Sequence, residues 1–240
     1  MVELSPSLAI GWCVSQAVAL VGSLYLLLPS RVRSLPRDDP EHIRYRAVSM
    51  LLSLFISLLG TWWLLGSDSL SFVQGATSKT TFLPLLHFVI LFAGPVSALY
   101  FLPHATSVTY SHELLIDMRN LFLAPIVEEL IFRNSMAVTL LNTQEPRFSR
   151  NFILFFPPLL FGAAHIHHWV LAVRRGEMPV KQAVLSMLFQ VAYTTLFGAL
   201  MMDLLLKTEN AIAICLIHSW CNFMGFPNFG LICNLPYVKA

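Results

Sequence analysis

Two adjacent carboxylates and an arginine lie in an otherwise apolar stretch, residues 121–141, which reads LFLAPIVEELIFRNSMAVTLL. Each charge costs about 2.5–3.5 kcal/mol at the centre of a membrane helix on insertion scales. Glu129 and Arg133 stand at i and i+4 with the acid first, which favours a helical ion pair. Glu128 lies about 100° around the helix and is left as the unpaired acid. The stretch predicts a functional site inside the membrane; the plainer alternative is a structural salt bridge beside a snorkelling glutamate.

Two further apolar segments each carry a pair of side chains at helical spacing. One segment reads FGAAHIHH from Phe161, and the other reads HSWCN from His218. Phe161 and His165 are i and i+4, as are His218 and Asn222, so each pair shares one helix face. Taken alone, Asn222 also fits an interhelical hydrogen bond of the kind common in membrane bundles.

A carboxylate and a histidine that share one water molecule meet the needs of non-covalent hydrolysis. Glu128 would take a proton from the water as it attacks a carbonyl, and His165 would orient the water or carry the proton to the leaving amine. His218 and Asn222 would donate hydrogen bonds to the developing oxyanion. The neighbouring ion pair would fix the helix and neutralise the second acid.

The composition indicates that membrane helices position the glutamates, histidines and asparagine of the three motifs. Of the 240 residues, 56% are hydrophobic and 12% are charged, against about 25% charged in ordinary soluble domains. The net charge of +2 is too small to indicate nucleic-acid binding. The sequence therefore predicts an all-α, polytopic membrane bundle of one integral domain, 1–240, with three motif-poor spans in 1–110 and a catalytic core in 111–230.

Seven apolar stretches have the length to cross a bilayer, and only helices satisfy their backbone groups in lipid. With seven spans, alternate loops on one side, starting with 29–46, hold ten basic residues and those on the other side hold four. The positive-inside rule then places the 29–46 loop in the cytoplasm. The predicted spans are 8–28, 47–66, 82–102, 120–141, 152–173, 182–206 and 211–226.

The three motifs, in this order on successive apolar segments, resemble the type II CAAX prenyl endopeptidases, the Ras-converting enzymes of the CAAX protease and bacteriocin-processing superfamily. That family's pattern is E-E-x-x-x-R, then F-x-x-x-H, then H-x-x-x-[NB]. The resemblance covers about residues 110–230. The matching residues here are Glu128, Glu129, Arg133, Phe161, His165, His218 and Asn222.

The resemblance implies a multi-pass enzyme of the endoplasmic reticulum membrane. It would remove the last three residues from prenylated C-terminal CAAX proteins such as small GTPases, without a cofactor or a metal. Glu128 and His165 would activate the water. His218 and Asn222 would stabilise the oxyanion. The supporting residues would be Glu129, Arg133 and Phe161.

Two other interpretations of the same residues remain open. Two histidines and a glutamate also resemble a zinc set, although H-E-x-x-H is absent and the groups would converge from three spans. A non-proteolytic transporter or scaffold could use Glu128, His165 and His218 as a proton relay. The amide of Asn222 on the His218 face is better explained by an oxyanion than by proton conduction.

The chain departs from the family after the third motif. Family members usually continue with an eighth span, whereas here 18 residues follow Asn222, and residues 226–238 form a short segment interrupted by proline. We interpret the sequence as a truncated or divergent form.

Overall fold

The computed structural model describes residues 3–74, 77–93 and 113–225, and nearly all of its regular structure is helical. This confirms the predicted all-α bundle. The elements are α1 (Pro6–Leu26), α2 (Ser30–Arg33), α3 (Pro40–Leu65), η1 (Gly66–Leu70), α4 (Ser71–Gln74), α5 (Ser78–Leu91), α7 (Leu114–Asp117), η2 (Met118–Leu123), α8 (Ala124–Glu128), η3 (Glu129–Ser135), α9 (Met136–Leu141), α10 (Arg150–Ala164), α11 (Ile166–Arg174), α12 (Val180–Thr208) and α13 (Ala211–Met224).

Within the described ranges, four helical stretches are long and apolar enough to cross a membrane, and shorter apolar helices accompany them. The long stretches are Pro6–Leu26, Pro40–Leu70, Arg150–Arg174 and Val180–Thr208. The predicted span 120–141 is part of an unbroken helical run from α7 to α9. The second half of the predicted span 82–102 lies outside the described residues, as does the segment 226–240.

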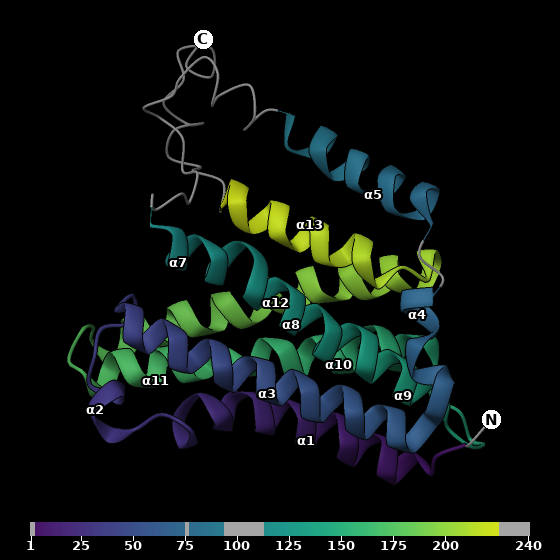
Figure 1. Cartoon of the computed structure of the whole chain (residues 1–240), viewed down its shortest axis with the longest axis horizontal. Coiled ribbons are helices and arrows are strands. Elements are labelled where there is room, and N and C mark those ends of the chain that lie inside the picture. The colour runs from purple at the N-terminus through teal and green to yellow at the C-terminus, as the bar shows by residue number, and fades with distance from the viewer. Residues whose placement is uncertain (1–2, 75–76, 94–112, 226–240) are drawn as a thin grey trace.

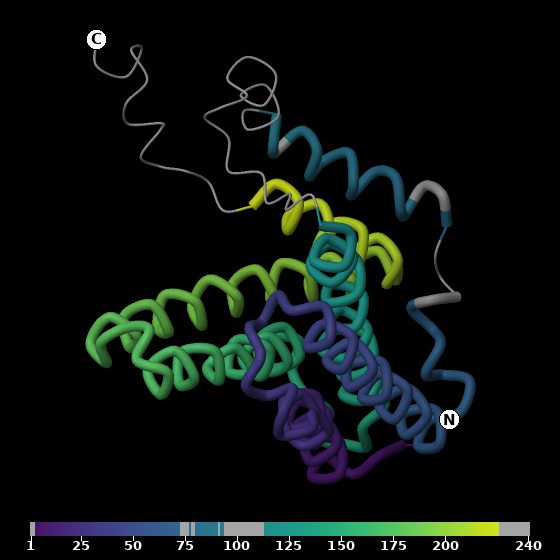
Figure 2. Tube along the Cα trace, turned by 60° about the vertical axis from the view of Figure 1, so that its left-hand side comes forward, coloured from purple at the N-terminus to yellow at the C-terminus, as the bar shows by residue number. Residues whose placement is uncertain are grey.

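The run from α7 to α9, which carries the first motif, is the central element of the bundle. It packs against α1, α3, α10, α12 and α13, and Figures 1 and 2 show helices around it in both views. Its η2 and η3 segments are π-helical, a wider turn often found at functional sites. Because protein surrounds this run, its charges face other helices rather than lipid.

Side-chain caps fix where three of the surrounding helices begin. Asp39 accepts hydrogen bonds from the backbone of Glu41 and His42, so α3 begins at Pro40. This start is earlier than the predicted residue 47 and places Arg44 and Arg46 in the helix rather than in a loop. Ser149 and Asn210 cap α10 and α13 in the same way, since their oxygens satisfy backbone N–H groups left free at a helix start.

A buried polar network joins α1, α3 and η3. Ser135 Oγ donates to Gln16 Oε1 at 2.7 Å and lies 2.6 Å from Thr61 Oγ1. Trp12 Nε1 donates to the same Thr61 oxygen at 3.0 Å, and Ser57 also bonds Gln16. Such bonds hold helices together where lipid provides no hydrophobic driving force.

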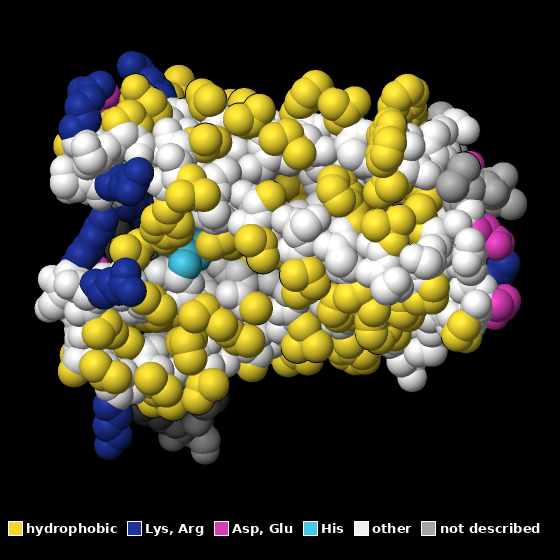
Figure 3. Space-filling model, turned by 90° about the horizontal axis from the view of Figure 1, so that it is seen from below, with side chains coloured by type: hydrophobic (Ala, Val, Ile, Leu, Met, Phe, Trp, Pro, Cys, Tyr) yellow, Lys and Arg dark blue, Asp and Glu magenta, His cyan; other side chains and the backbone are white. Residues whose placement is uncertain are grey.

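Basic side chains gather at one end of the bundle (Figure 3). Arg119 forms an ion pair with Asp38 at 2.7 Å, and Arg175 donates to the carbonyl of Arg33, so three chain segments meet there. At the other end, Asp203 pairs with Arg150 and Lys207 at 2.6 Å each. Each of these described contacts joins chain segments that the seven-span prediction places on the same side of the membrane.

Two glycines allow α10 to pack closely against α12. A Cβ atom at Gly162 would lie 2.5 Å from Thr195 Oγ1 and 3.0 Å from the carbonyl oxygen of Val191. A Cβ atom at Gly198 would lie 2.8 Å from Arg133 Nη2 and 3.0 Å from Pro158 Cβ. The second contact brings α12 directly against the buried arginine of the first motif.

Replacing Gly162 with alanine should destabilise the protein, because the added methyl group meets a backbone carbonyl that cannot rotate away. We expect a loss of about 1–3 kcal/mol, typical of overpacking, measured as a lower Tm in detergent. Gly11→Ala is the matched control, since its Cβ would meet nothing within 4 Å. Equal Tm values for the two variants would contradict this account of the α10–α12 contact.

Candidate active site

The centre of the site is the ion pair that the i, i+4 spacing predicts. Arg133 Nη1 lies 3.3 Å from Glu129 Oε1, and both side chains are 0% exposed. The prediction of this pair is confirmed. A buried arginine without a counter-charge is strongly destabilising. Glu129 is therefore needed to compensate the charge of Arg133.

Phe161 packs the second motif against the first. The guanidinium carbon of Arg133 lies 4.0 Å from the centroid of the Phe161 ring, a cation–π distance. The ring also makes edge contacts with Phe132, His165 and His218, at centroid distances of 5.3, 4.7 and 6.3 Å. Phe161 thus fixes both histidines relative to the ion pair, which is a physical reason for an aromatic residue four positions before His165.

His218 connects the two glutamates. Its Nδ1–H donates to Glu129 Oε1 at 2.6 Å, which turns the opposite edge of the ring toward Glu128, with Nε2 3.8 Å from Glu128 Oε2. The sequence left Glu128 without a partner; in the structure it faces this imidazole, just beyond hydrogen-bond distance. A small group between the two atoms would contact both.

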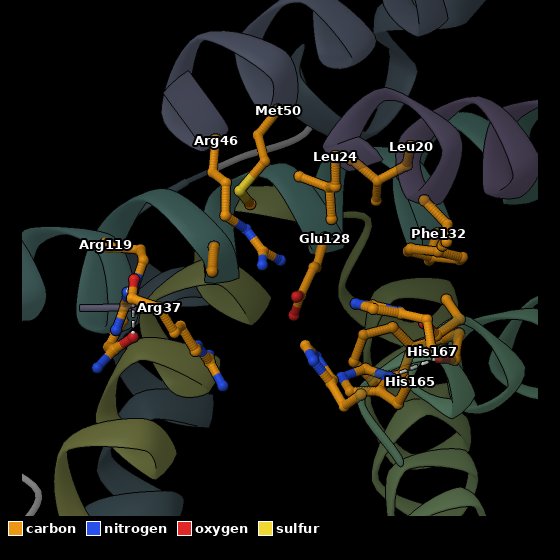
Figure 4. A pocket seen from close by; sticks show the side chains of 16 residues that line it. Leu20, Leu24, Arg37, Arg46, Met50, Arg119, Glu128, Phe132, His165 and His167 are labelled. Atoms are coloured by element: carbon orange, nitrogen blue, oxygen red, sulfur yellow. Dashed lines mark hydrogen bonds between the residues drawn. The ribbon is translucent and has the colours of Figure 1, made fainter. Parts of the chain in front are cut away.

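Glu128 and His165 line one cavity of about 90 Å³. Figure 4 shows the Glu128 carboxylate pointing into it, with Arg46 on one side and His165 and His167 on the other. His165 stands where α10 ends and α11 begins, and its Nδ1–H donates to the carbonyl of Phe161 at 2.8 Å. In the neutral ring this leaves Nε2 as a proton acceptor.

The third motif reaches the cavity less directly. Among the described residues, the cavity lining includes Asn120 but neither His218 nor Asn222. Asn222 Nδ2 donates to the carbonyl of Asn120 at 3.0 Å, which holds the end of α13 against η2. The structure therefore brings Glu128 and His165 together at the cavity, with His218 and Asn222 immediately behind it.

Three arginines and two histidines in the lining were not predicted as part of a site. They are Arg37, Arg46, Arg119, His167 and His168. In the sequence, these arginines served only as indicators of topology. The signal that would have found Arg46 is its place within the first two turns of a capped helix, four residues before the buried Met50.

Arg37 lies in the linker before α3, outside the membrane helices. Its side chain lines the cavity and keeps an exposed part. Removal of water by surrounding protein atoms, and next the charge of Arg119, lower its pKa from the ordinary value. Positive charges are thus crowded at this end of the cavity.

No group of three or more His, Cys, Asp or Glu side chains with metal-binding geometry occurs in the part of the chain that the structure describes. The groups of the zinc alternative lie on three elements, with Glu128 on α8, His165 at the α10–α11 junction and His218 on α13.

Comparisons with known proteins show which family the chain is similar to. The family model Type II CAAX prenyl endopeptidase Rce1-like matches residues 110–224. The chain is 35% identical to the CAAX prenyl protease 2 of Homo sapiens, over 90% of this chain and 70% of the human protein. It is 33% identical to the probable CAAX prenyl protease 2 of Schizosaccharomyces pombe, over 89% of this chain and 80% of the yeast protein. No solved structure matches.

The fold and the comparisons together define an α-helical, multi-pass membrane protein of a protease class. More specifically, the chain belongs to the type II CAAX prenyl endopeptidase family. The family resemblance predicted from the three motifs is confirmed.

Replacing Glu128 or Glu129 with glutamine should have different effects on the thermal stability of the protein. Glu129→Gln leaves Arg133 buried without its counter-charge, and breaking a buried pair costs about 3–5 kcal/mol. Glu128→Gln changes a side chain that is 21% exposed to the cavity and is not required by Arg133. Thermal unfolding in detergent should therefore show a large drop in Tm for Glu129→Gln and a small one for Glu128→Gln. The reverse order would show that the structural acid has been assigned wrongly.

Proposed function

We propose that this protein is an endopeptidase that removes the aaX tripeptide from prenylated CAAX proteins, with Glu128 and His165 activating the attacking water. The observation that carries the proposal is the shared cavity, which holds one partly exposed carboxylate and one imidazole with a free proton acceptor. The names of the relatives support the substrate class. We further propose that it acts in the endoplasmic reticulum membrane on prenylated proteins such as small GTPases.

The first half of the reaction uses the difference between the two acids. Water between Glu128 and His165 loses a proton to the carboxylate as its oxygen attacks the carbonyl carbon after the prenylated cysteine. Glu129 cannot serve as this base because it is buried, paired with Arg133 and hydrogen-bonded to His218. Its task is to hold the imidazole in place.

The oxyanion that forms would be stabilised by His218 and Asn222. Because Nδ1–H of His218 already donates to Glu129, Nε2 donates to an oxyanion only when the ring carries both protons. The distance of 3.8 Å between Nε2 and Glu128 Oε2 supports a position of this donor close to the carbon that the water would attack. Asn222 would add an amide donor from the same face of α13.

In the second half, the proton that Glu128 took from water passes through His165 to the leaving amine nitrogen, and the C–N bond breaks. His165 is suited to this transfer because its Nε2 accepts a proton while Nδ1–H stays bonded to Phe161. The products are a prenylcysteine carboxylate and a free tripeptide. The prenyl chain, dissolved in the bilayer, would present the bond to a cavity within the helix bundle.

The two alternatives differ in what they require of these residues. A zinc protease with the same substrate would bind metal through Glu128, His165 and His218. A proton relay in a transporter would need titratable groups only, and neither the bond from Asn222 to the η2 backbone nor the family membership favours it.

The direct test is incubation of the purified, reconstituted protein with a farnesylated CAAX peptide. The wild type should release the tripeptide, and Glu128→Gln should lower turnover by about 10²–10⁴, the usual effect of losing a general base. Asn222→Ala should lower it by about 10²–10³ with substrate affinity little changed. No tripeptide from the wild type would refute the proposed activity.

The same preparation separates the metal-free mechanism from the zinc alternative. Active protein should hold no stoichiometric zinc and should keep its activity with a strong chelator. Stoichiometric zinc, together with activity lost to the chelator and restored by zinc, would replace the glutamate mechanism with a metal one.

A further inference from the structure

Two arginines belong both to the catalytic cavity and to a larger cavity beside it. Arg37 and Arg46 line the 90 Å³ cavity that contains Glu128, and they also line a neighbouring cavity of about 440 Å³. The larger cavity lies at the basic end of the bundle, where Arg33 and Arg175 also border it. The two arginines therefore border both cavities.

The other arginines around these cavities already have partners. Arg119 binds Asp38 and the carbonyl of Arg37, at 2.7 and 3.0 Å. Arg33 donates to the carbonyl of Leu28 at 2.8 Å, and Arg175 lies 3.8 Å from Glu177. These contacts use their charge to hold the linker and the helix ends together.

Arg37 and Arg46 differ from this group. Within the described ranges, neither guanidinium has a hydrogen-bond or ion-pair partner. Figure 4 shows both side chains bordering the same cavity as Glu128. Among the described residues of that lining, Glu128 is the one acid against three arginines, so these side chains together carry excess positive charge when the glutamate is ionised.

The guanidinium groups of Arg37 and Arg46 suit a small planar anion. A guanidinium presents N–H donors in a fork that matches a carboxylate, and charge-assisted bonds of this kind are stronger than neutral ones. A peptide cut three residues before its end carries such an anion at a fixed distance from the scissile bond. Three extended residues span at most about 10–11 Å.

We propose that Arg37 and Arg46 bind the free α-carboxylate of the substrate's last residue. The inference rests on the proposed endopeptidase activity and adds the feature that sets the length of the released peptide. With the carboxylate held by the two arginines and the cleaved carbonyl beside Glu128, the enzyme selects a bond three residues from a free C-terminus.

The test compares two farnesylated CAAX peptides that differ only at the C-terminus, one a free acid and the other an amide. The wild type should cleave the acid with a KM about tenfold to a hundredfold lower, the effect expected of charge-assisted hydrogen bonds. In Arg37→Gln/Arg46→Gln, the preference should be lost, so that the ratio of the KM for the amide to the KM for the acid falls to about one.

Arg44→Gln is the matched control. Arg44 lies on the same helix as Arg46 at the same end of the bundle, is exposed, and lines neither cavity among the described residues. It should keep the full preference for the acid. Arg37→Lys/Arg46→Lys, which keeps the charge but loses the fork, should give an intermediate preference.

The outcomes are distinguishable. Equal KM values for acid and amide in the wild type, a comparison that needs no variant, would overturn the inference and leave the endopeptidase activity intact. Variants that change the KM for both peptides equally, in a way that depends on anionic lipid in the vesicles, would assign the arginines to lipid phosphate instead and also overturn it. Cleavage of neither peptide by the wild type would refute the proposed function itself.

Discussion

A fully buried arginine in the centre of a membrane bundle is the constraint on which the site depends. Arg133 is surrounded by protein and packed on the Phe161 ring, and its charge is compensated by Glu129 at 3.3 Å. Desolvating two charges is expensive, and their attraction offsets this only with good geometry and further support. The aromatic ring beneath Arg133 and the histidine bonded to Glu129 provide that support.

The ion pair with Arg133 gives the adjacent residues Glu128 and Glu129 different roles, although both are glutamates. Glu129 Oε1 is held between Arg133 and His218. Glu128, about one quarter of a turn away, faces a cavity and an imidazole edge instead. Helix α12 approaches closely at Gly198 and covers the guanidinium group of Arg133. The separation of a structural acid from a cavity-facing acid therefore follows from helix geometry.

Local spacing was enough to predict part of this site. The Glu129–Arg133 pair follows from acid-first i, i+4 order, and the contact between Phe161 and His165 follows from the same period. The helical class follows from the apolar composition, since helices satisfy backbone groups in lipid. These features depend on residues close together in the chain.

The remaining features depend on tertiary packing and could not be predicted from one sequence. His218 and Glu129 are 89 positions apart, and no local pattern indicates that they touch. The network linking Gln16 to Ser135 is of the same kind. Arg46 looked like a topological signal because the Asp39 cap, which moves the start of α3 earlier, was not recognised.

The central claim is that Glu129 is retained to compensate Arg133, and a double-mutant cycle on thermal stability tests it most directly. Glu129→Gln, Arg133→Met and the double variant should be compared in detergent, with the exposed pair Arg31–Glu41 as the reference cycle. The account predicts that the double variant is more stable than the two single losses added together, with a coupling of about 1–3 kcal/mol, against about 0–1 kcal/mol for the exposed pair. Additive losses at Glu129 and Arg133 would contradict it.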